Sequence, residues 1–398
     1  MKEIADRPCP ICGEARVEVL HTQRFELPQG HPLSGGYDVV SCRTCGFVYA
    51  DTKVSQAAYD SYYAELSKYE DRKTSSGSGE SPFDRKRLQA TARQIVDCLR
   101  NPEARILDVG CANGGLLSAL REAGYTNLCG VDPSPACAEN TRRLGVDAYS
   151  GTFSQPFQHG EVDCAILSHT LEHVQNLNEA THWIDRILAE NGTVYVEVPD
   201  AVRYVDYLYA PFQDFNTEHI NHFSLLSIRR LMNRAGCELV SAGEKLLVTS
   251  KDTNYPAIFS FWRRAATNSV MPELPRDEEL KASLLRYIRA SRMLLDRIDA
   301  QLRKILSRKT PVIVWGTGQL ALKLLVETSL GEAAIAAFVD SNPVNHGQIL
   351  RGVSVISPEA VRGLEAPIVI ATILHQREIA EQIRQMGLPN EILFLETT

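Results

Sequence analysis

The sequence of 398 residues contains no apolar run that approaches the ~20 residues of a membrane-spanning helix. Its first residues, MKEIADRPCPICGE, also lack the apolar core of a secretory signal, so we expect a cytoplasmic protein without a membrane partner. The chain also lacks an excess of positive charge, since 42 Lys and Arg stand against 49 Asp and Glu. The formal net charge of -7 argues against a nucleic-acid partner, because proteins that bind the phosphate backbone usually carry a basic surface.

The chain otherwise has the composition of an ordinary globular protein, with 44% hydrophobic and 23% charged residues. Its length allows two or three domains of roughly 100–200 residues each. Most of its cysteines are scattered through helix and strand patterns, where we expect small reduced core residues rather than disulfides. These cysteines are Cys98, Cys111, Cys129, Cys137, Cys164 and Cys237.

The other four cysteines form two Cys-x-x-Cys-Gly sequences, the first at Cys9 and Cys12 and the second at Cys42 and Cys45. Four thiolates at this spacing predict a closed, tetrahedral and therefore structural zinc site. A redox dithiol is the alternative, but thioredoxin-like sites need one such pair in a strand–helix–strand setting. We predict a zinc ribbon whose folding energy comes largely from the metal, because so small a ribbon has little core.

The most informative stretch is residues 106–135, ILDVGCANGGLLSALREAGYTNLCGVDPSP. An apolar run ends at Asp108, a glycine-rich turn and a helical pattern follow, and a second apolar run ends at Asp132. This order is the one by which a doubly wound sheet binds a nucleoside-containing cofactor at the carboxyl ends of its strands. Asp132 lies 22 residues after Gly110, where a carboxylate can accept both ribose hydroxyls.

Later strands extend this ligand edge. The fourth predicted strand ends at Leu167 and delivers Ser168, His169 and His173 to the edge. Residues 151–153 follow the third predicted strand, and we expect them to lie near the base of the nucleoside, an adenine. The predicted cofactor-binding residues are Asp108, Gly110, Cys111, Gly114, Asp132, Pro133, Thr152, Phe153, Ser168 and His169. Strands are predicted at 106–108, 127–131, 147–149, 162–167, 193–197 and 238–242.

The glycine-rich turn is spelled GCANG, from Gly110 to Gly114, and not GxGxxG as in dinucleotide sites. With Asp108 before it, the turn resembles the first motif of class I S-adenosylmethionine-dependent methyltransferases, D-x-G-x-G-x-G, with Ala112 at the middle glycine. The resemblance implies an enzyme with S-adenosylmethionine as cofactor, in which Asp108 reaches toward the methionine amine and Asp132 holds the ribose. An ordinary turn of another α/β protein is the alternative interpretation.

Beyond this region, apolar residues from 279 to 306 repeat at helical spacing and predict a long helix within 271–308. Residues 311–315 then begin a second α/β unit, in which GTGQLA is a GxGxxA turn and the next strand ends at Asp340. Three interpretations of this unit stay open: a dinucleotide site, a pocket for a nucleotide-linked substrate, and a structural domain. The predicted α/β architecture is a zinc ribbon (1–52), a doubly wound methyltransferase sheet (53–268) with a helical lid (53–100), a helical bridge (269–308) and a Rossmann-like domain (309–398).

This order of parts is similar to that of the deoxysugar C-methyltransferases, which act on nucleotide-linked 4-keto sugars. The most specific local element is FNTEHINHFS, residues 215–224, where that family carries Tyr-x-Glu-His followed by Phe-Ser. The resemblance implies that Glu218, His219 and His173 line the sugar site. Asn216 departs from the family because it stands at the position of the tyrosine.

Methylation of a carbon beside a ketone needs a base that removes the proton and a donor for the enolate oxygen. We predict His219 as the base, with His173 or His222 as the next candidates. Glu218 could hold one tautomer of the neighbouring imidazole. Tyrosines that could replace the missing phenol are Tyr62, Tyr63 and Tyr69. The polar segment 71–84 is either a plain linker or an active-site loop that orders over the cofactor.

The predicted function is therefore S-adenosylmethionine-dependent C-methylation of a nucleotide-linked keto-deoxysugar. Two alternatives remain open. One is O- or N-methylation of another small molecule, where a base only has to relieve the acceptor of its proton. The other is a scaffold that binds the cofactor without catalysis.

Overall fold

The computed structural model describes residues 2–65, 77–153, 155, 157, 160–250, 253–266 and 272–396. Tyr69 and the first part of the polar segment, residues 71–76, lie outside the described residues. The chain divides into two compact units. The first contains Met1–Val19, Val40–Tyr207 and Glu218–Ser283, and the second contains Leu20–Val39, Leu208–Thr217 and Leu284–Thr398. Within the described ranges, no helix is both long enough and apolar enough to span a membrane.

A seven-stranded sheet organises the first unit, with strand order β10-β11-β8-β7-β4-β5-β6. Five neighbouring strands are parallel: β4 (Ile106–Val109), β5 (Leu128–Asp132), β6 (Asp147–Ser150), β7 (Val162–Ser168) and β8 (Leu188–Pro199). Two antiparallel strands complete one edge: β10 (Cys237–Ser250) and β11 (Thr253–Arg264). The α/β class is confirmed, and every predicted core strand is present.

The strand β11 was not predicted. Its sequence contains Pro256, which favours an edge position or a loop because proline cannot donate to the ladder. In the structure, β11 is an interior strand. Its pairing with β8 begins only at Ala257, opposite Pro199, so the missing N–H of Pro256 does not interrupt that ladder.

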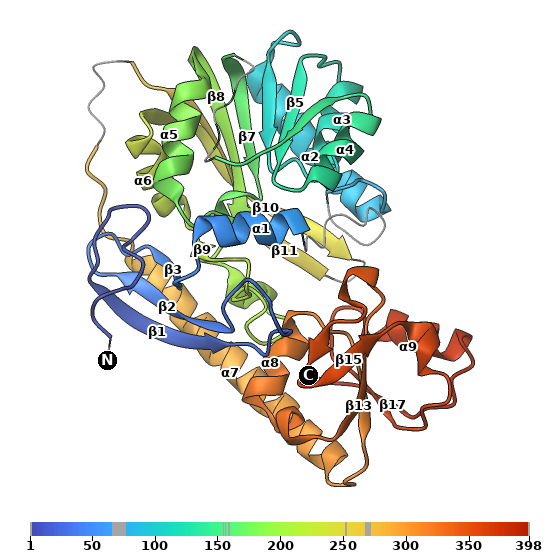
Figure 1. Cartoon of the computed structure of the whole chain (residues 1–398). Helices are drawn as coiled ribbons and strands as arrows, with labels where there is room; N and C mark the ends of the chain where they lie inside the picture. The colour runs from blue at the N-terminus through green and yellow to red at the C-terminus, as the bar shows by residue number, and fades with distance from the viewer. Residues whose placement is uncertain are drawn as a thin grey trace. The chain divides into compact units, whose positions relative to one another are not determined.

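Helices cover both faces of this sheet. Figure 1 shows α2 (Pro82–Leu99), α3 (Gly115–Glu122) and α4 (Pro135–Arg143) on one face, and α5 (Leu177–Ile187) and α6 (Leu225–Arg234) on the other. Ser-Pro sequences begin α2 and α4: the hydroxyls of Ser81 and Ser134 accept hydrogen bonds from the N–H groups of Asp84 and Cys137. Apolar residues of α2 and α3 pack with β4, β7 and β8 in one buried core.

Buried Arg7 fastens the N-terminal segment to the rest of the first unit. Its guanidinium donates to the carbonyl oxygens of Ala50 (3.2 Å) and Val174 (3.4 Å), to that of Gln175, and to Oδ1 of Asn221 (3.1 Å). The short strand β9 (Asn221–His222) also pairs with β3 (Val48–Asp51). These contacts tie the chain on both sides of the cysteine pairs to the segment that contains residues 218–222.

The second unit has a six-stranded sheet of order β14-β15-β13-β12-β16-β17. Its strands are β12 (Val312–Trp315), β13 (Ile335–Val339), β14 (Ile349–Leu350), β15 (Val353–Ile356), β16 (Ile368–Ile370) and β17 (Ile392–Leu393), all parallel except β14. Its sequence also forms α8 (Gln319–Glu327) and α9 (Gln376–Gln385). The GxGxxA turn therefore joins β12 to α8, as its sequence predicts.

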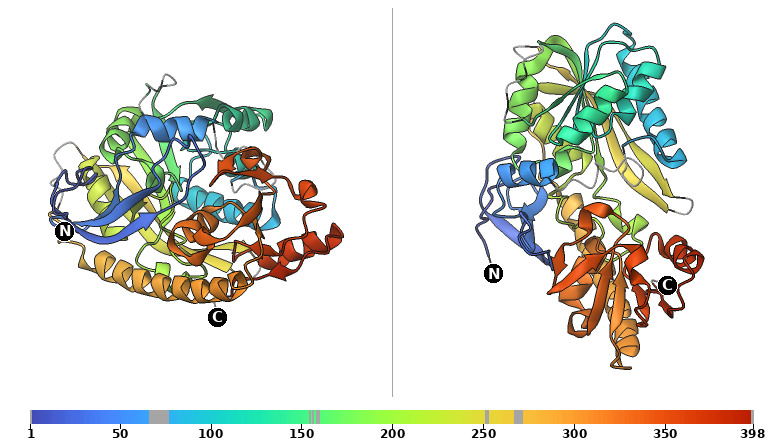
Figure 2. Two further views of the ribbon diagram at one scale, coloured as in Figure 1. Left: turned by 60° about the horizontal axis from the view of Figure 1, so that its bottom comes forward. Right: turned by 45° about the vertical axis from the view of Figure 1, so that its right-hand side comes forward.

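The predicted long helix is α7 (Glu278–Leu306), one continuous helix in Figure 2. Its prediction within 271–308 extended too far toward the N-terminus, since residues 272–277 are not helical. The physical reason is a cap. Oδ1 of Asp277 accepts a hydrogen bond from the N–H of Leu280 (3.0 Å), one of the backbone N–H groups that have no partner within the helix. Asp277 therefore caps the helix, which begins at the next residue.

A buried lysine joins separate stretches of the second unit. Nζ of Lys323 donates to Oε1 of Gln23 (2.8 Å) and of Glu327 (2.9 Å) and lies 4.3 Å from the ring centroid of Phe212. Burial lowers the pKa of Lys323 to about 8, and the charge of Glu327 opposes this shift. The ring of His21 stacks on Phe212 at 4.4 Å. His21 is thus a packing residue of β1 (Val17–Arg24).

The two Cys-x-x-Cys-Gly turns differ in their surroundings, and this difference gives the first prediction. Gly46 has φ +81°, and a Cβ there would lie 2.5 Å from the carbonyl oxygen of Asp277, whereas Gly13, at φ +80°, faces open space. Both Gly46→Ala and Gly13→Ala place a side chain in the left-handed region, at about 1–2 kcal/mol. Thermal unfolding should show a clearly larger loss for Gly46→Ala. Equal losses would contradict the packing described.

Candidate functional site

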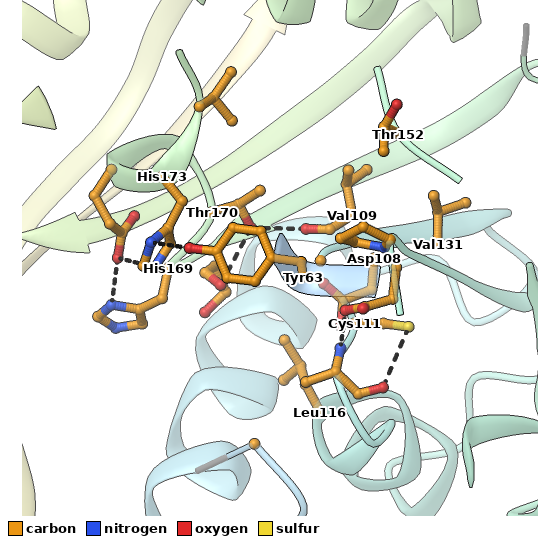
Figure 3. Close-up of a pocket in the computed structure, with 18 of the residues that line it drawn as sticks. Tyr63, Asp108, Val109, Cys111, Leu116, Val131, Thr152, His169, Thr170 and His173 are labelled. Carbon is orange, nitrogen blue, oxygen red and sulfur yellow. Dashed lines mark hydrogen bonds and ion pairs between the residues drawn. The ribbon is translucent and has the colours of Figure 1, made fainter. Parts of the chain in front are cut away.

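The carboxyl ends of the parallel strands border a cavity of about 320 Å³ in the first unit. All predicted cofactor residues except Gly114 line it. Figure 3 shows Asp108, Cys111 and Thr152 among the lining residues, together with His169 and His173. The predicted ligand edge is therefore hollow, as a binding site requires.

The glycine-rich turn is shaped by left-handed backbone. Gly110 (φ 80°), Ala112 (φ 46°) and Gly114 (φ 75°) all have positive φ. A Cβ on Gly114 would lie 2.8 Å from Oγ1 of Thr141, so this glycine allows the turn to approach α4 instead of lining the cavity. Ala112 occupies a position that glycine adopts more easily, and its N–H donates to Oδ2 of Asp132 (2.8 Å).

Two buried carboxylates give the cavity its charge. Asp132 also accepts from the N–H of Ser134 (2.9 Å), which fixes its orientation. Burial raises the pKa of Asp108 to about 7, with a further contribution from the charge of Asp132, and burial raises the pKa of Asp132 to about 6. Desolvated carboxylates of this kind favour a cationic ligand, because a nearby positive charge stabilises their ionised forms.

A chain of charges leads from the sheet to the cavity. Nδ1 and Nε2 of His169 lie 3.1 Å from Oε1 of Glu172 and 3.2 Å from Oε1 of Glu197. Oε2 of Glu197 accepts from Nζ of Lys245 (2.7 Å) and from the hydroxyl of Tyr195 (2.5 Å). Burial favours neutral His169, but the two glutamates outweigh it and raise the pKa of His169 to about 9.

A tyrosine and two histidines form the polar end of the cavity. The hydroxyl of Tyr63, on α1 (Gln56–Glu65), lies 2.9 Å from Nδ1 of His173, on the 3-10 helix η2 (Leu171–His173). The same hydroxyl lies 3.4 Å from Oε2 of Glu218. The rings of His173 and His219 meet edge to face at 4.9 Å. Tyr63, His173 and His219 all line the cavity, and Figure 3 shows Tyr63 pointing at His173.

Comparison with known proteins identifies the first unit's sheet. Residues 83–242 match the family model described as a methyltransferase domain. This region is a methyltransferase domain. The match confirms the predicted class I S-adenosylmethionine-dependent methyltransferase domain. Residues 308–393, in the second unit, match the family described as C2185-like, N-terminal.

Individual relatives are distant. The C-methyltransferase NovU of Streptomyces niveus is 24% identical over 275 residues, which are 65% of this chain and 63% of that protein. The chain thus matches less than two thirds of that relative's length. Magnesium protoporphyrin IX methyltransferase of Synechocystis PCC 6803, solved with bound S-adenosylmethionine, is 18% identical with a TM-score of 0.38, covering 53% of this chain and 97% of that one. A Haloferax volcanii methyltransferase, solved in a complex with the activator Trm112, is 18% identical with a TM-score of 0.40. The match covers 46% of this chain and 92% of that one.

Not every predicted acid–base residue lines the methyltransferase-domain cavity. Glu218 is buried behind the lining, with its carbonyl oxygen 3.1 Å from Nδ1 of His173. His222 lies on β9, fully buried beside Tyr204 at 6.1 Å between rings, and burial lowers its pKa to about 3. Asn216 belongs to the second unit, where its carbonyl accepts from the hydroxyl of Tyr37 (2.8 Å).

Three residues of the charge chain were not predicted. Glu172 precedes His173 directly, and Glu197 ends a predicted strand at the ligand edge, so a signal was available for both. Lys245 gave no such signal. Lys245 lies on β10, which pairs with β11, and β11 pairs with β8, the strand of Glu197. These long-range pairings bring Lys245 to Glu197, and no local sequence pattern reveals them.

The four cysteines of the N-terminal pairs meet in one cluster. Their sulfur atoms all lie within 4.8 Å of one another, with Cys9 to Cys45 at 3.6 Å and Cys12 to Cys42 at 3.5 Å. A tetrahedron of sulfurs around zinc, with bonds of ~2.3 Å, has edges of about 3.8 Å. The donor set and its spacing therefore fit a zinc ion.

The carboxylate pair yields the second prediction. S-adenosylmethionine, the cofactor of the predicted family, carries positive charge, so binding should lower the raised pKa values of Asp108 and Asp132 and release protons between about pH 6 and 7. Affinity should rise with pH across that window. Calorimetry in buffers of different ionisation enthalpy measures the release.

Asp132→Asn should reduce both the affinity and the proton release. Asp147→Asn is the matched control, because Asp147 is exposed on β6 and does not line the cavity. Binding without any proton release in the wild-type protein would contradict this account of the pair.

Proposed function

We propose that the protein is an S-adenosylmethionine-dependent methyltransferase that methylates carbon beside a ketone in a small molecule of the nucleotide-linked keto-deoxysugar class. The observation that carries the proposal is one cavity that joins two sets of residues. Asp108 and Asp132 line it beside the glycine-rich turn, and Tyr63, His173 and His219 line it as a proton-handling group.

The cofactor's place follows from the fit of its charge and hydroxyls to the turn. Asp132 would hold the ribose hydroxyls, Asp108 would face the methionine amine, and Thr152 and Phe153 would border the adenine. When bound, S-adenosylmethionine supplies an electrophilic methyl group on a sulfonium. The protein's own contribution is to place the acceptor carbon in line with that methyl group and to exclude water.

The carbon must first lose a proton. His219 is the proposed base: it takes the proton, and the electron pair of the broken C–H bond moves into the enolate. Tyr63 would donate a hydrogen bond to the enolate oxygen, a role that a hydroxyl can fill. With the cofactor held by Asp108 and Asp132, the enolate carbon would be the nucleophile for its methyl group, and the thioether would be the leaving group.

His173 supports this arrangement. Its Nδ1 faces the carbonyl oxygen of Glu218, which can only accept, so Nδ1 carries the proton and Nε2 the lone pair in the neutral ring. The hydroxyl of Tyr63 lies against the same Nδ1. In this proposal Tyr63 supplies the phenol that is missing because Asn216 stands at the tyrosine position of the sugar enzymes. The name of NovU, a C-methyltransferase, supports methylation at carbon.

We also propose that Cys9, Cys12, Cys42 and Cys45 bind a structural zinc ion. The four thiolates would complete its coordination, so no position is left for a substrate or water. The metal would stabilise the second turn where the N–H of Asp277 donates to the carbonyl oxygen of Cys45 (3.0 Å).

Proton exchange tests the function, and this is the third prediction. In deuterated water, with S-adenosylhomocysteine in place of the methyl donor, the protein should exchange the proton beside the ketone of a nucleotide-linked 4-keto sugar. His219→Ala should slow the exchange on the order of 10²-fold or more, the usual contribution of a positioned base. Mass spectrometry follows the exchange.

His182→Ala is the matched control, since His182 is exposed on α5 and does not line the cavity. Methyl transfer to an oxygen or nitrogen, with no exchange at carbon, would overturn C-methylation but leave the methyltransferase assignment intact.

The fourth prediction concerns zinc. The purified protein should contain one zinc ion per chain, and Cys42→Ser should lose it and lower the unfolding midpoint. Cys98→Ser, outside the cluster, should keep the zinc ion. Elemental analysis and thermal unfolding, with and without a chelator, make the measurement. A metal-free wild-type protein whose midpoint is insensitive to zinc would refute the proposal.

A further inference from the structure

The chain of charges behind the cavity ends at an acid–base residue. Nζ of Lys245 lies 2.7 Å from Oε2 of Glu197, whose Oε1 lies 3.2 Å from Nε2 of His169. Nδ1 of His169 lies 3.1 Å from Oε1 of Glu172. From Glu172, Oε1 lies 4.0 Å from Nε2 of His173. Positive and negative groups therefore alternate from the interior of the sheet to the proton-handling group.

His169 holds this chain together and takes no part in proton removal. Each of its nitrogens faces a carboxylate oxygen, and a carboxylate can only accept, so both nitrogens carry protons. Its pKa, raised to about 9 by Glu172 and Glu197 against the effect of burial, agrees with a permanent imidazolium. A positive φ of 55° places the ring between the two glutamates.

Glu172 is left with unused capacity. Its side chain is 1% exposed and lines the cavity, and Oε1 is bound by His169. Oε2 is buried and has no hydrogen-bond partner among the residues that the structure describes. A buried polar atom without a hydrogen-bond partner costs free energy, which a nearby donor or positive charge would recover.

We propose that Glu172 is a positioning residue whose carboxylate, fixed by His169 and Glu197, stabilises the imidazolium of His173 when the His173–His219 pair takes up the acceptor's proton. The inference rests on the proposed function and deepens it. His219 removes the proton and passes it to Nε2 of His173, which carries the lone pair of the neutral ring. One nitrogen of each ring lies within 4.8 Å of the other, a span that a water molecule can bridge. Glu172 supplies the balancing negative charge on the Nε2 side.

The surroundings of His173 make the direction of the effect definite. Tyr63 and the carbonyl of Glu218 face Nδ1, the ring of His219 faces the ring edge, and Glu172 faces Nε2. The carboxylate of Glu218 accepts from the hydroxyl of Tyr63 (3.4 Å). Removing the charge of Glu172 should therefore make His173 harder to protonate.

Histidine NMR on the full-length protein provides the test and needs no acceptor. In isotope-labelled protein with S-adenosylhomocysteine, the pKa of His173, assigned by its loss in His173→Asn, should fall by about 1–3 units in Glu172→Gln, the effect of an opposite charge at this distance. Glu244→Gln, an exposed carboxylate on β10, should change nothing. An unchanged pKa of His173 in Glu172→Gln would overturn the proposal.

Two further arms make the result specific. Glu172→Asp keeps the negative charge but moves it away from His173, so the pKa of His173 should fall by less than in Glu172→Gln. This variant serves as the test if Glu172→Gln does not fold. An unchanged pKa of His173 in Glu172→Asp would also overturn the proposal. Ligand atoms of Glu172, His173 and His219 lie within 4.8 Å of one another, so the titration is repeated with a chelator. If the chelator alone changes the pKa of His173, these side chains hold a metal ion and the proposal is wrong.

Failure here and failure of the proposed function are distinguishable. Deuterium exchange that depends on His219, together with an unchanged pKa of His173, would leave the function standing and remove only the role of Glu172. A fall in the pKa of His173 without any deuterium exchange would leave the interaction of Glu172 with His173 standing and overturn the proposed function.

Discussion

The parallel order of β8, β7, β4 and β5 is the constraint on which the rest of the site depends. It brings the carboxyl ends of four strands to one edge, and with them Asp108, Asp132, His169 and Glu197. The carboxylates outnumber the cation among these four groups. The same edge therefore shapes the glycine-rich turn and supplies the negative charge that a sulfonium cofactor needs.

The polar end of the cavity comes from segments outside the sheet. Tyr63 lies on α1, His173 on η2, and His219 in the segment before β9. Arg7 and Asn221 join the segments of His173 and His219. Arg7 donates to the carbonyl oxygen of Val174 (3.4 Å) and to Oδ1 of Asn221 (3.1 Å), and Nδ2 of Asn221 donates to the carbonyl oxygen of Leu171 (2.8 Å). The N-terminal segment thus supports the segments that contain His173 and His219, and a zinc ion in the cysteine cluster would stiffen it.

What the sequence predicts well is local. The turn from Asp108 to Gly114 can be predicted because strand, turn and helix are continuous in the chain. Which tyrosine faces the histidines depends on the docking of α1, and Tyr63 was one of three candidates until the structure placed it. The same limit applies to Lys245, which reaches Glu197 through the β10–β11 hairpin, and to Lys323, which bonds Gln23 from 300 residues away.

The most direct test of the account is the fate of the methyl group itself. The protein would be incubated with S-adenosylmethionine labelled with carbon-13 at the methyl group and with a carbon-13-labelled nucleotide-linked 4-keto sugar. The account predicts a product whose labelled methyl shows one-bond coupling to the sugar carbon beside the ketone. A labelled methyl attached to oxygen or nitrogen would contradict it.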